Sequence, residues 1–66
     1  MPKLSDRLRS LRNSRGLSQQ KLADLLGVSK SSINMYERDE RVPRDEVKVR
    51  IASYFKTSVQ DIFFTD

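Results

Sequence analysis

The sequence predicts an all-α fold, a compact single domain over residues 1–66 that is built from five short helices. Apolar residues recur three and four positions apart, which is the spacing that gathers side chains on one face of a helix. The two glycines and the second proline fall between these periodic stretches, where helices end or begin. A chain of 66 residues buries only about 60% of its unfolded surface, so we expect a small core.

The first helix is expected over residues 4–15. Its leucines stand at positions i, i+4 and i+7 and therefore share one face, while arginines lie elsewhere around the helix. Gly16 is expected to end this helix, and Leu17 is expected to enter the core. The leucines of the buried face are Leu4, Leu8 and Leu11.

Two further helical patterns meet at Gly27, within the stretch 19–38. Gly27 suits the end of the first pattern, because glycine adopts a left-handed conformation without steric cost. Ser18 and Ser29 precede the two patterns, where serine caps the N-terminus of a helix. The apolar residues at helical spacing are Leu22, Ala23 and Leu26 before the glycine, and Ile33 and Tyr36 after it. Two helices joined by a tight turn that contains glycine have the layout of a helix-turn-helix.

The same stretch resembles a known family. The segments 18–23 and 27–29 are similar to the helix-turn-helix of the phage repressor and Cro-type (Xre-type) DNA-binding domains, and the likeness runs from Leu8 to Phe63. The resemblance implies a compact five-helix, lambda-repressor-like domain whose partner is double-stranded DNA. It also implies a transcriptional regulator, more often a repressor than an activator, and a cytoplasmic location, which the absence of cysteine fits.

The fourth helix is expected to begin beside Pro43, because a proline at a helix start loses no hydrogen bond. Two acidic residues follow, where carboxylates complement the partial positive charge of the helix end. The buried face is expected to comprise Val47, Ile51, Tyr54 and Phe55, with Val49 and Ala52 beside it. A fifth short helix is expected from Thr57, because Ser58 and Asp61 have the spacing of a capping box.

Composition narrows the class of function. Residues 1–44 hold ten basic and five acidic side chains, and residues 45–66 hold three and four, which together give the net charge of +4. A basic front half suits a polyanion, although basic surface residues also keep small proteins soluble. Histidine and cysteine are absent, so the usual catalytic bases, nucleophiles and metal ligands are missing. We expect no enzyme activity, no metal and no cofactor, and no apolar run is long enough to span a membrane.

The outer face of the helix after Gly27 holds the candidate base-reading residues. Because Ile33 and Tyr36 are expected to point inward, the residues at i, i+1, i+4 and i+5 from Lys30 share the opposite face. Lysine can donate to guanine, asparagine can pair with adenine, serine can contact several bases, and an apolar group can contact the thymine methyl. The expected base-reading residues, which also match the family's base-reading positions, are Lys30, Ser31, Asn34 and Met35.

Contacts to DNA phosphates are expected on both sides of that helix. The first turn after Ser18 presents backbone N–H groups to an anion, and arginines before and after Pro43 can clamp phosphates without reading sequence. The expected phosphate-contacting residues are Gln19, Ser29, Ser32, Arg38, Arg41 and Arg44. The resemblance further implies a partly buried structural ion pair between Arg12 and Glu37.

The apolar residues near the end of the chain exceed what a short last helix needs for the core, and an exposed apolar patch often marks a contact surface. The expected homodimer interface consists of Val59, Ile62, Phe63 and Phe64. A dimer would place its two recognition helices about 34 Å apart, in successive major grooves of a pseudo-palindromic operator. No small-molecule ligand is expected. An antitoxin or another protein-interaction module with the same fold is the alternative.

Overall fold

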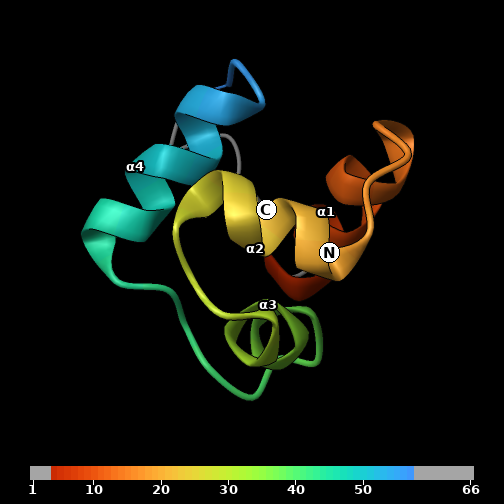
Figure 1. The fold of residues 1–66 in the computed structure, drawn as a ribbon. Helices are drawn as coiled ribbons and strands as arrows, with labels where there is room; N and C mark the ends of the chain where they lie inside the picture. Colours follow the sequence, from red (N-terminus) through yellow and green to blue (C-terminus); the bar gives the residue numbers. More distant parts are fainter. Residues whose placement is uncertain (1–3, 58–66) are drawn as a thin grey trace.

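The computed structural model describes residues 4–57, and this part of the chain folds into four helices around one core (Figure 1). The prediction of a compact, all-helical fold is confirmed. None of the described helices is long and apolar enough to cross a membrane. The helices are α1 (Leu4–Ser14), α2 (Gln19–Leu26), α3 (Lys30–Glu37) and α4 (Asp45–Tyr54). The fifth helix that the sequence predicts lies outside the described residues, as do Val59, Ile62, Phe63 and Phe64.

The four largest completely buried side chains of the core come one from each helix: Leu8, Leu22, Ile33 and Ile51. Burial of each such side chain stabilises the fold by about 1.5–3 kcal/mol. Helix α3 packs against both α2 and α1, while α4 packs against α2. Figure 1 shows α3 along its axis while α2 runs across the view, so these two helices cross steeply. This crossing leaves one side of α3 facing away from the rest of the domain.

Local sequence signals determine how α2 and α3 are joined. Ser18 accepts a hydrogen bond from the backbone N–H of Lys21, and Ser29 accepts one from the N–H of Ser32, each at 3.0 Å. Gly27 follows α2 in the left-handed conformation, with φ at 70°, and its own N–H bonds to a carbonyl of α2. Both serine caps and the glycine turn are therefore as predicted.

Helix α4 begins beside Pro43, as the sequence predicts. Pro43 is buried directly before Arg44, which occupies the N-cap position. Arg44 makes no side-chain capping bond, so the acidic residues of the first turn are left to balance the positive helix end. After α4, Phe55 is buried and Lys56 adopts a left-handed φ of 55°, which ends the helix.

Two helix ends and several burial predictions differ from expectation. Helix α1 ends at Ser14 and α3 ends at Glu37, each one residue before the end that the sequence predicts, residue 15 and Arg38. Leu4, Leu11 and Tyr54, which were predicted on buried faces, are only partly buried against the core.

Val49 is 57% exposed, although it was expected beside the buried face of α4. Val49 stands two positions from both Val47 and Ile51, which places it about 200° around the helix from each of them. Because those two residues face the core, Val49 must face away from it.

Candidate nucleic-acid interface

The four predicted base-reading residues lie on the side of α3 opposite its core-facing residues. Ile33 and Tyr36 are buried beneath them and hold the helix against the domain. Among the four, Lys30 and Ser31 are exposed, while Asn34 and Met35 are half-buried. This face of α3 therefore presents an ammonium, a hydroxyl, an amide and a thioether group.

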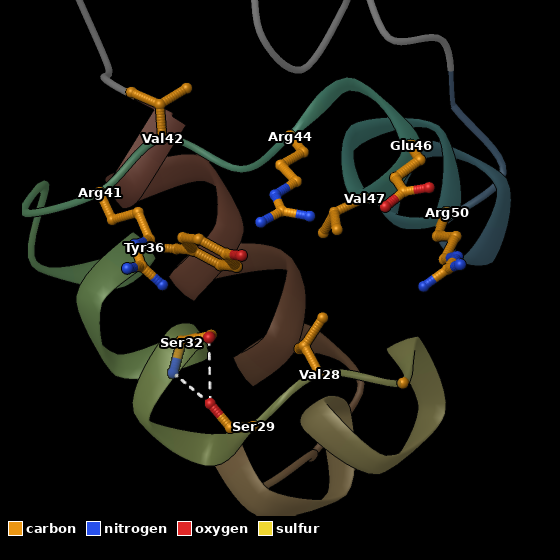
Figure 2. Close-up of a pocket in the computed structure, with 11 residues that line it drawn as sticks. Val28, Ser29, Ser32, Tyr36, Arg41, Val42, Arg44, Glu46, Val47 and Arg50 are labelled. Carbon is orange, nitrogen blue, oxygen red and sulfur yellow. Dashed lines mark hydrogen bonds between the residues drawn. The ribbon is translucent and has the colours of Figure 1, made fainter.

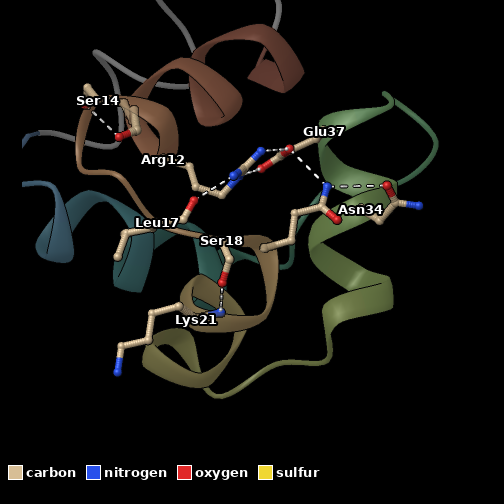
Figure 3. A network of polar contacts seen from close by, with 9 residues as sticks. Arg12, Ser14, Leu17, Ser18, Lys21, Asn34 and Glu37 are labelled. Atoms are coloured by element: carbon tan, nitrogen blue, oxygen red, sulfur yellow. Dashed lines mark hydrogen bonds and ion pairs between the residues drawn. The ribbon is translucent and has the colours of Figure 1, made fainter.

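A nearly buried ion pair fixes α3 to α1. Arg12 donates from Nε to Oε2 of Glu37 at 2.6 Å and from Nη2 to Oε1 at 3.0 Å (Figure 3). The side chains of Arg12 and Glu37 are only 13% and 3% exposed. Arg12 also donates from Nη1 to the carbonyl of Leu17 at 2.7 Å, so one guanidinium ties together α1, the loop after it and α3. The hydrogen bond to Glu37 raises the pKa of Arg12, against an opposing effect of burial, and keeps the guanidinium charged.

Gln19, a predicted phosphate contact, joins this pair. Its amide Nε2 donates to Oε1 of Glu37 at 3.2 Å and lies 3.4 Å from Oδ1 of Asn34. The glutamine side chain is half-buried between the start of α2 and the last turns of α3. The sequence-based prediction missed this contact between Gln19 and Asn34, because the two residues lie on different helices.

A hollow of about 440 Å³ lies beside α3, between the turn that precedes it, the linker that follows it and the first turns of α4 (Figure 2). Four of the six predicted phosphate-contacting residues line it: Ser29, Ser32, Arg41 and Arg44. The two hydroxyls hydrogen-bond to each other at 3.0 Å. Guanidinium groups beside hydroxyls and a helix N-terminus can bind a phosphate through charge-assisted hydrogen bonds.

Arg50 also lines the hollow, and the sequence-based prediction missed it. Its Nη1 donates to the carbonyl of Leu26 at 3.2 Å, across 24 positions of the chain, so no local spacing signals its place. Glu46 brings a carboxylate to the same hollow and reduces its positive charge.

Arg38, the remaining predicted phosphate contact, does not line the hollow. It follows α3 as the C-cap residue and lies 3.3 Å from the carboxylate of Glu40. Both side chains are largely exposed, and an exposed pair of this kind contributes about 0–1 kcal/mol. Arg38 can therefore exchange Glu40 for another anion at little cost.

Comparisons with known proteins identify the family of the chain. The sequence profile of the helix-turn-helix family matches residues 8–62 of the chain. A candidate HTH-type transcriptional regulatory protein of Pyrococcus furiosus is 40% identical over 50 residues, which cover 76% of this chain but only 16% of that protein.

Solved structures show the same fold. The restriction-modification controller protein C.AhdI from Aeromonas hydrophila superposes with a TM-score of 0.81 at 32% identity, over 91% of each chain. The P22 c2 repressor in complex with a synthetic operator superposes with a TM-score of 0.93 over 100% of each chain. Its sequence identity is 24%, so that likeness shows the fold alone.

Proposed function

The chain belongs to the helix-turn-helix family of DNA-binding domains, and from this premise we propose that residues 1–66 form one domain that regulates transcription by sequence-specific DNA binding. We infer that it acts as a repressor in the cytoplasm. In this proposal a homodimer occupies a pseudo-palindromic operator, with α3 of each subunit in a major groove.

The outer face of α3 is the observation that carries the proposal. Its polar side chains face away from the core, on a helix that two other helices hold in place. The fold is that of the P22 c2 repressor, which was solved in complex with a synthetic operator. Lys30, Ser31, Asn34 and Met35 are the proposed base-reading residues.

The hollow beside α3 supports the proposal independently. Ser29, Ser32, Arg41 and Arg44 gather there next to the proposed reading face, where a DNA backbone that flanks the groove would pass. We assign them to phosphate contacts, together with Gln19 through its backbone N–H and Arg38 on the far end of α3. These contacts would position the domain without reading sequence.

Binding-site selection from a random DNA pool tests the proposal. The expected result is a two-fold symmetric consensus whose half-sites lie about 10 base pairs apart, as successive grooves require. Asn34→Ala should weaken binding to the consensus while binding to random DNA is unchanged. Asn13→Ala is the matched control, because Asn13 is exposed on α1. This variant should bind the consensus and random DNA as the native chain does. Enrichment of no consensus would contradict the proposal.

The salt dependence of binding tests the phosphate contacts. Arg44→Ala should weaken binding to all sequences and reduce the slope of log K against log salt by about one unit. Arg9→Ala, on the exposed part of α1, is the control that should leave the slope unchanged. An unchanged slope in Arg44→Ala would remove Arg44 from the interface.

A further inference from the structure

We propose that the hollow beside α3 binds a small phosphomonoester, and that this ligand displaces DNA from the domain. The proposal rests on the proposed function, because it gives the hollow a second occupant that competes with the DNA backbone. The sequence predicts no small-molecule ligand, since the residues that form the hollow come together only when α4 packs beside the turn between α2 and α3.

The hollow is larger than one backbone phosphate requires. Its volume of about 440 Å³ corresponds to roughly fifteen water molecules at about 30 Å³ each. Sites for small molecules usually measure about 300–1,000 Å³. Val28, Val42 and Val47 add apolar walls beside the charged groups. A ligand with a body behind its phosphate can therefore occupy space that a passing DNA strand leaves empty.

Tyr36 provides a hydrogen-bond donor that is directed into this space. The residue is only 5% exposed, and Figure 2 shows its hydroxyl pointing into the hollow. Within the part of the chain that the structure describes, this hydroxyl has no hydrogen-bond partner, whereas every fully buried polar side-chain atom has one. The hydroxyl is therefore reachable from the hollow, where it can donate to an anion.

The charges that line the hollow match a dianion. The guanidinium groups of Arg41, Arg44 and Arg50, together with the carboxylate of Glu46, leave two net positive charges. A phosphomonoester carries a charge of about −1.5 to −2 at pH 7, whereas each backbone phosphate of DNA carries one negative charge. The hollow therefore complements a monoester better than a diester.

The hydrogen-bond donors of the hollow also favour a monoester. Ser29 and Ser32 bond to each other with one of their two hydroxyl hydrogens, so the other remains for a ligand. Arg50 uses one N–H for the carbonyl of Leu26 and keeps its others. A DNA phosphate continues into sugar on both sides, so the strand can only pass across the opening. A monoester ends in three acceptor oxygens and can enter with its phosphate first.

The ligand and DNA would exclude each other, because both use the serine hydroxyls and the linker arginines of the hollow. The apparent dissociation constant for DNA should therefore rise about elevenfold at a ligand concentration of ten times its own dissociation constant. A phosphorylated small molecule would thus release the domain from its operator.

The first test is a calorimetric titration without DNA. The probes are phenyl phosphate, a monoester, and methyl phenyl phosphate, the matched diester, and the native chain should bind the monoester at least about tenfold more tightly. Tyr36→Phe keeps the ring and removes the hydroxyl, and should weaken binding of phenyl phosphate by about tenfold or more, the size of one hydrogen bond to a charged group. Tyr54→Phe is the matched control, because Tyr54 packs on Phe55 and does not line the hollow.

The second test is competition, with a fluorescently labelled DNA duplex followed by anisotropy. Ionic strength is held constant, so that screening by the added anion is the same in every sample. Phenyl phosphate at ten times its dissociation constant should weaken DNA binding about elevenfold. Methyl phenyl phosphate at the same concentration should change it little.

Each outcome decides the proposal. Equal binding of the two probes, or binding of neither, would overturn it with the native chain alone. Unchanged binding of phenyl phosphate in a folded Tyr36→Phe, checked by circular dichroism, would overturn it as well, and so would monoester binding that leaves DNA affinity unchanged. Failure of the native chain to bind DNA at low salt without any ligand would instead remove the proposed function, so the two failures are distinguishable.

Discussion

Removal of one charge from the buried ion pair between Arg12 and Glu37 should lower the stability of the domain. Arg12→Met keeps most of the apolar stem but leaves a carboxylate that is 3% exposed and still accepts the hydrogen bond of the Gln19 amide. Stranding one charge of a buried pair costs about 3–5 kcal/mol. A domain of 66 residues is stabilised by about 3–10 kcal/mol in all, at roughly 0.05–0.15 kcal/mol per residue. The variant should therefore lose about 30% or more of its stability.

Urea unfolding followed by circular dichroism measures the loss. The matched control is Arg9→Met, on the same helix, whose pair with Asp6 is similarly short at 2.7 Å but has side chains that are 50% and 53% exposed. An exposed pair contributes about 0–1 kcal/mol, so the control should change little. If Arg12→Met cost no more than Arg9→Met, the reasoning from burial would be refuted.

Two further measurements separate charge from packing at this pair. The double variant Arg12→Met with Glu37→Leu should regain much of the stability, because an apolar pair can replace a buried ion pair without a stranded charge.

The raised pKa of Arg12 means that the contribution of Arg12 to stability in the native chain is complete below the pKa of the unfolded state. That contribution is lost only as pH rises through the still higher folded-state pKa, so no change near neutral pH should come from Arg12.

Three other variants test separate features. Gly27→Ala should cost about 1–2 kcal/mol in urea unfolding, because alanine is strained at a φ of 70° while its Cβ would meet only Arg50 at an ordinary 3.7 Å. Lys56→Gly should raise stability by up to about 1 kcal/mol, since glycine adopts a φ of 55° without that strain; a loss would contradict this account of the helix end. Phe64→Glu should shift the proposed dimer towards monomer in sedimentation, and an unaltered mass would exclude Phe64 from the interface.

The local parts of the fold could be read from the sequence because their causes are local. A serine before an apolar periodic stretch and a glycine after it are sufficient to place the ends of α2 and the start of α3, and the structure has both caps. Val49 is the exception: its apolar side chain favours burial, but its angle around α4 opposes that of the core-facing Val47 and Ile51. Hydrophobicity alone does not determine which side of a helix a residue occupies.

Contacts between helices could not be read in the same way. The hollow beside α3 includes Arg50 only because α4 packs against α2, so that its guanidinium reaches the carbonyl of Leu26. The spacing of the linker arginines does not indicate that Arg50 lies beside the same hollow.

The sequence by itself determined the family, the helix-turn-helix and the identity of the outward residues on α3, because periodicity and capping act within a few residues. Only the tertiary structure decided which atom of Asn34 faces outward. That choice depends on a chain of hydrogen bonds through Arg12, Glu37 and Gln19, which come from three helices. A donor must meet an acceptor at each step, and this condition exists only once the helices are packed together.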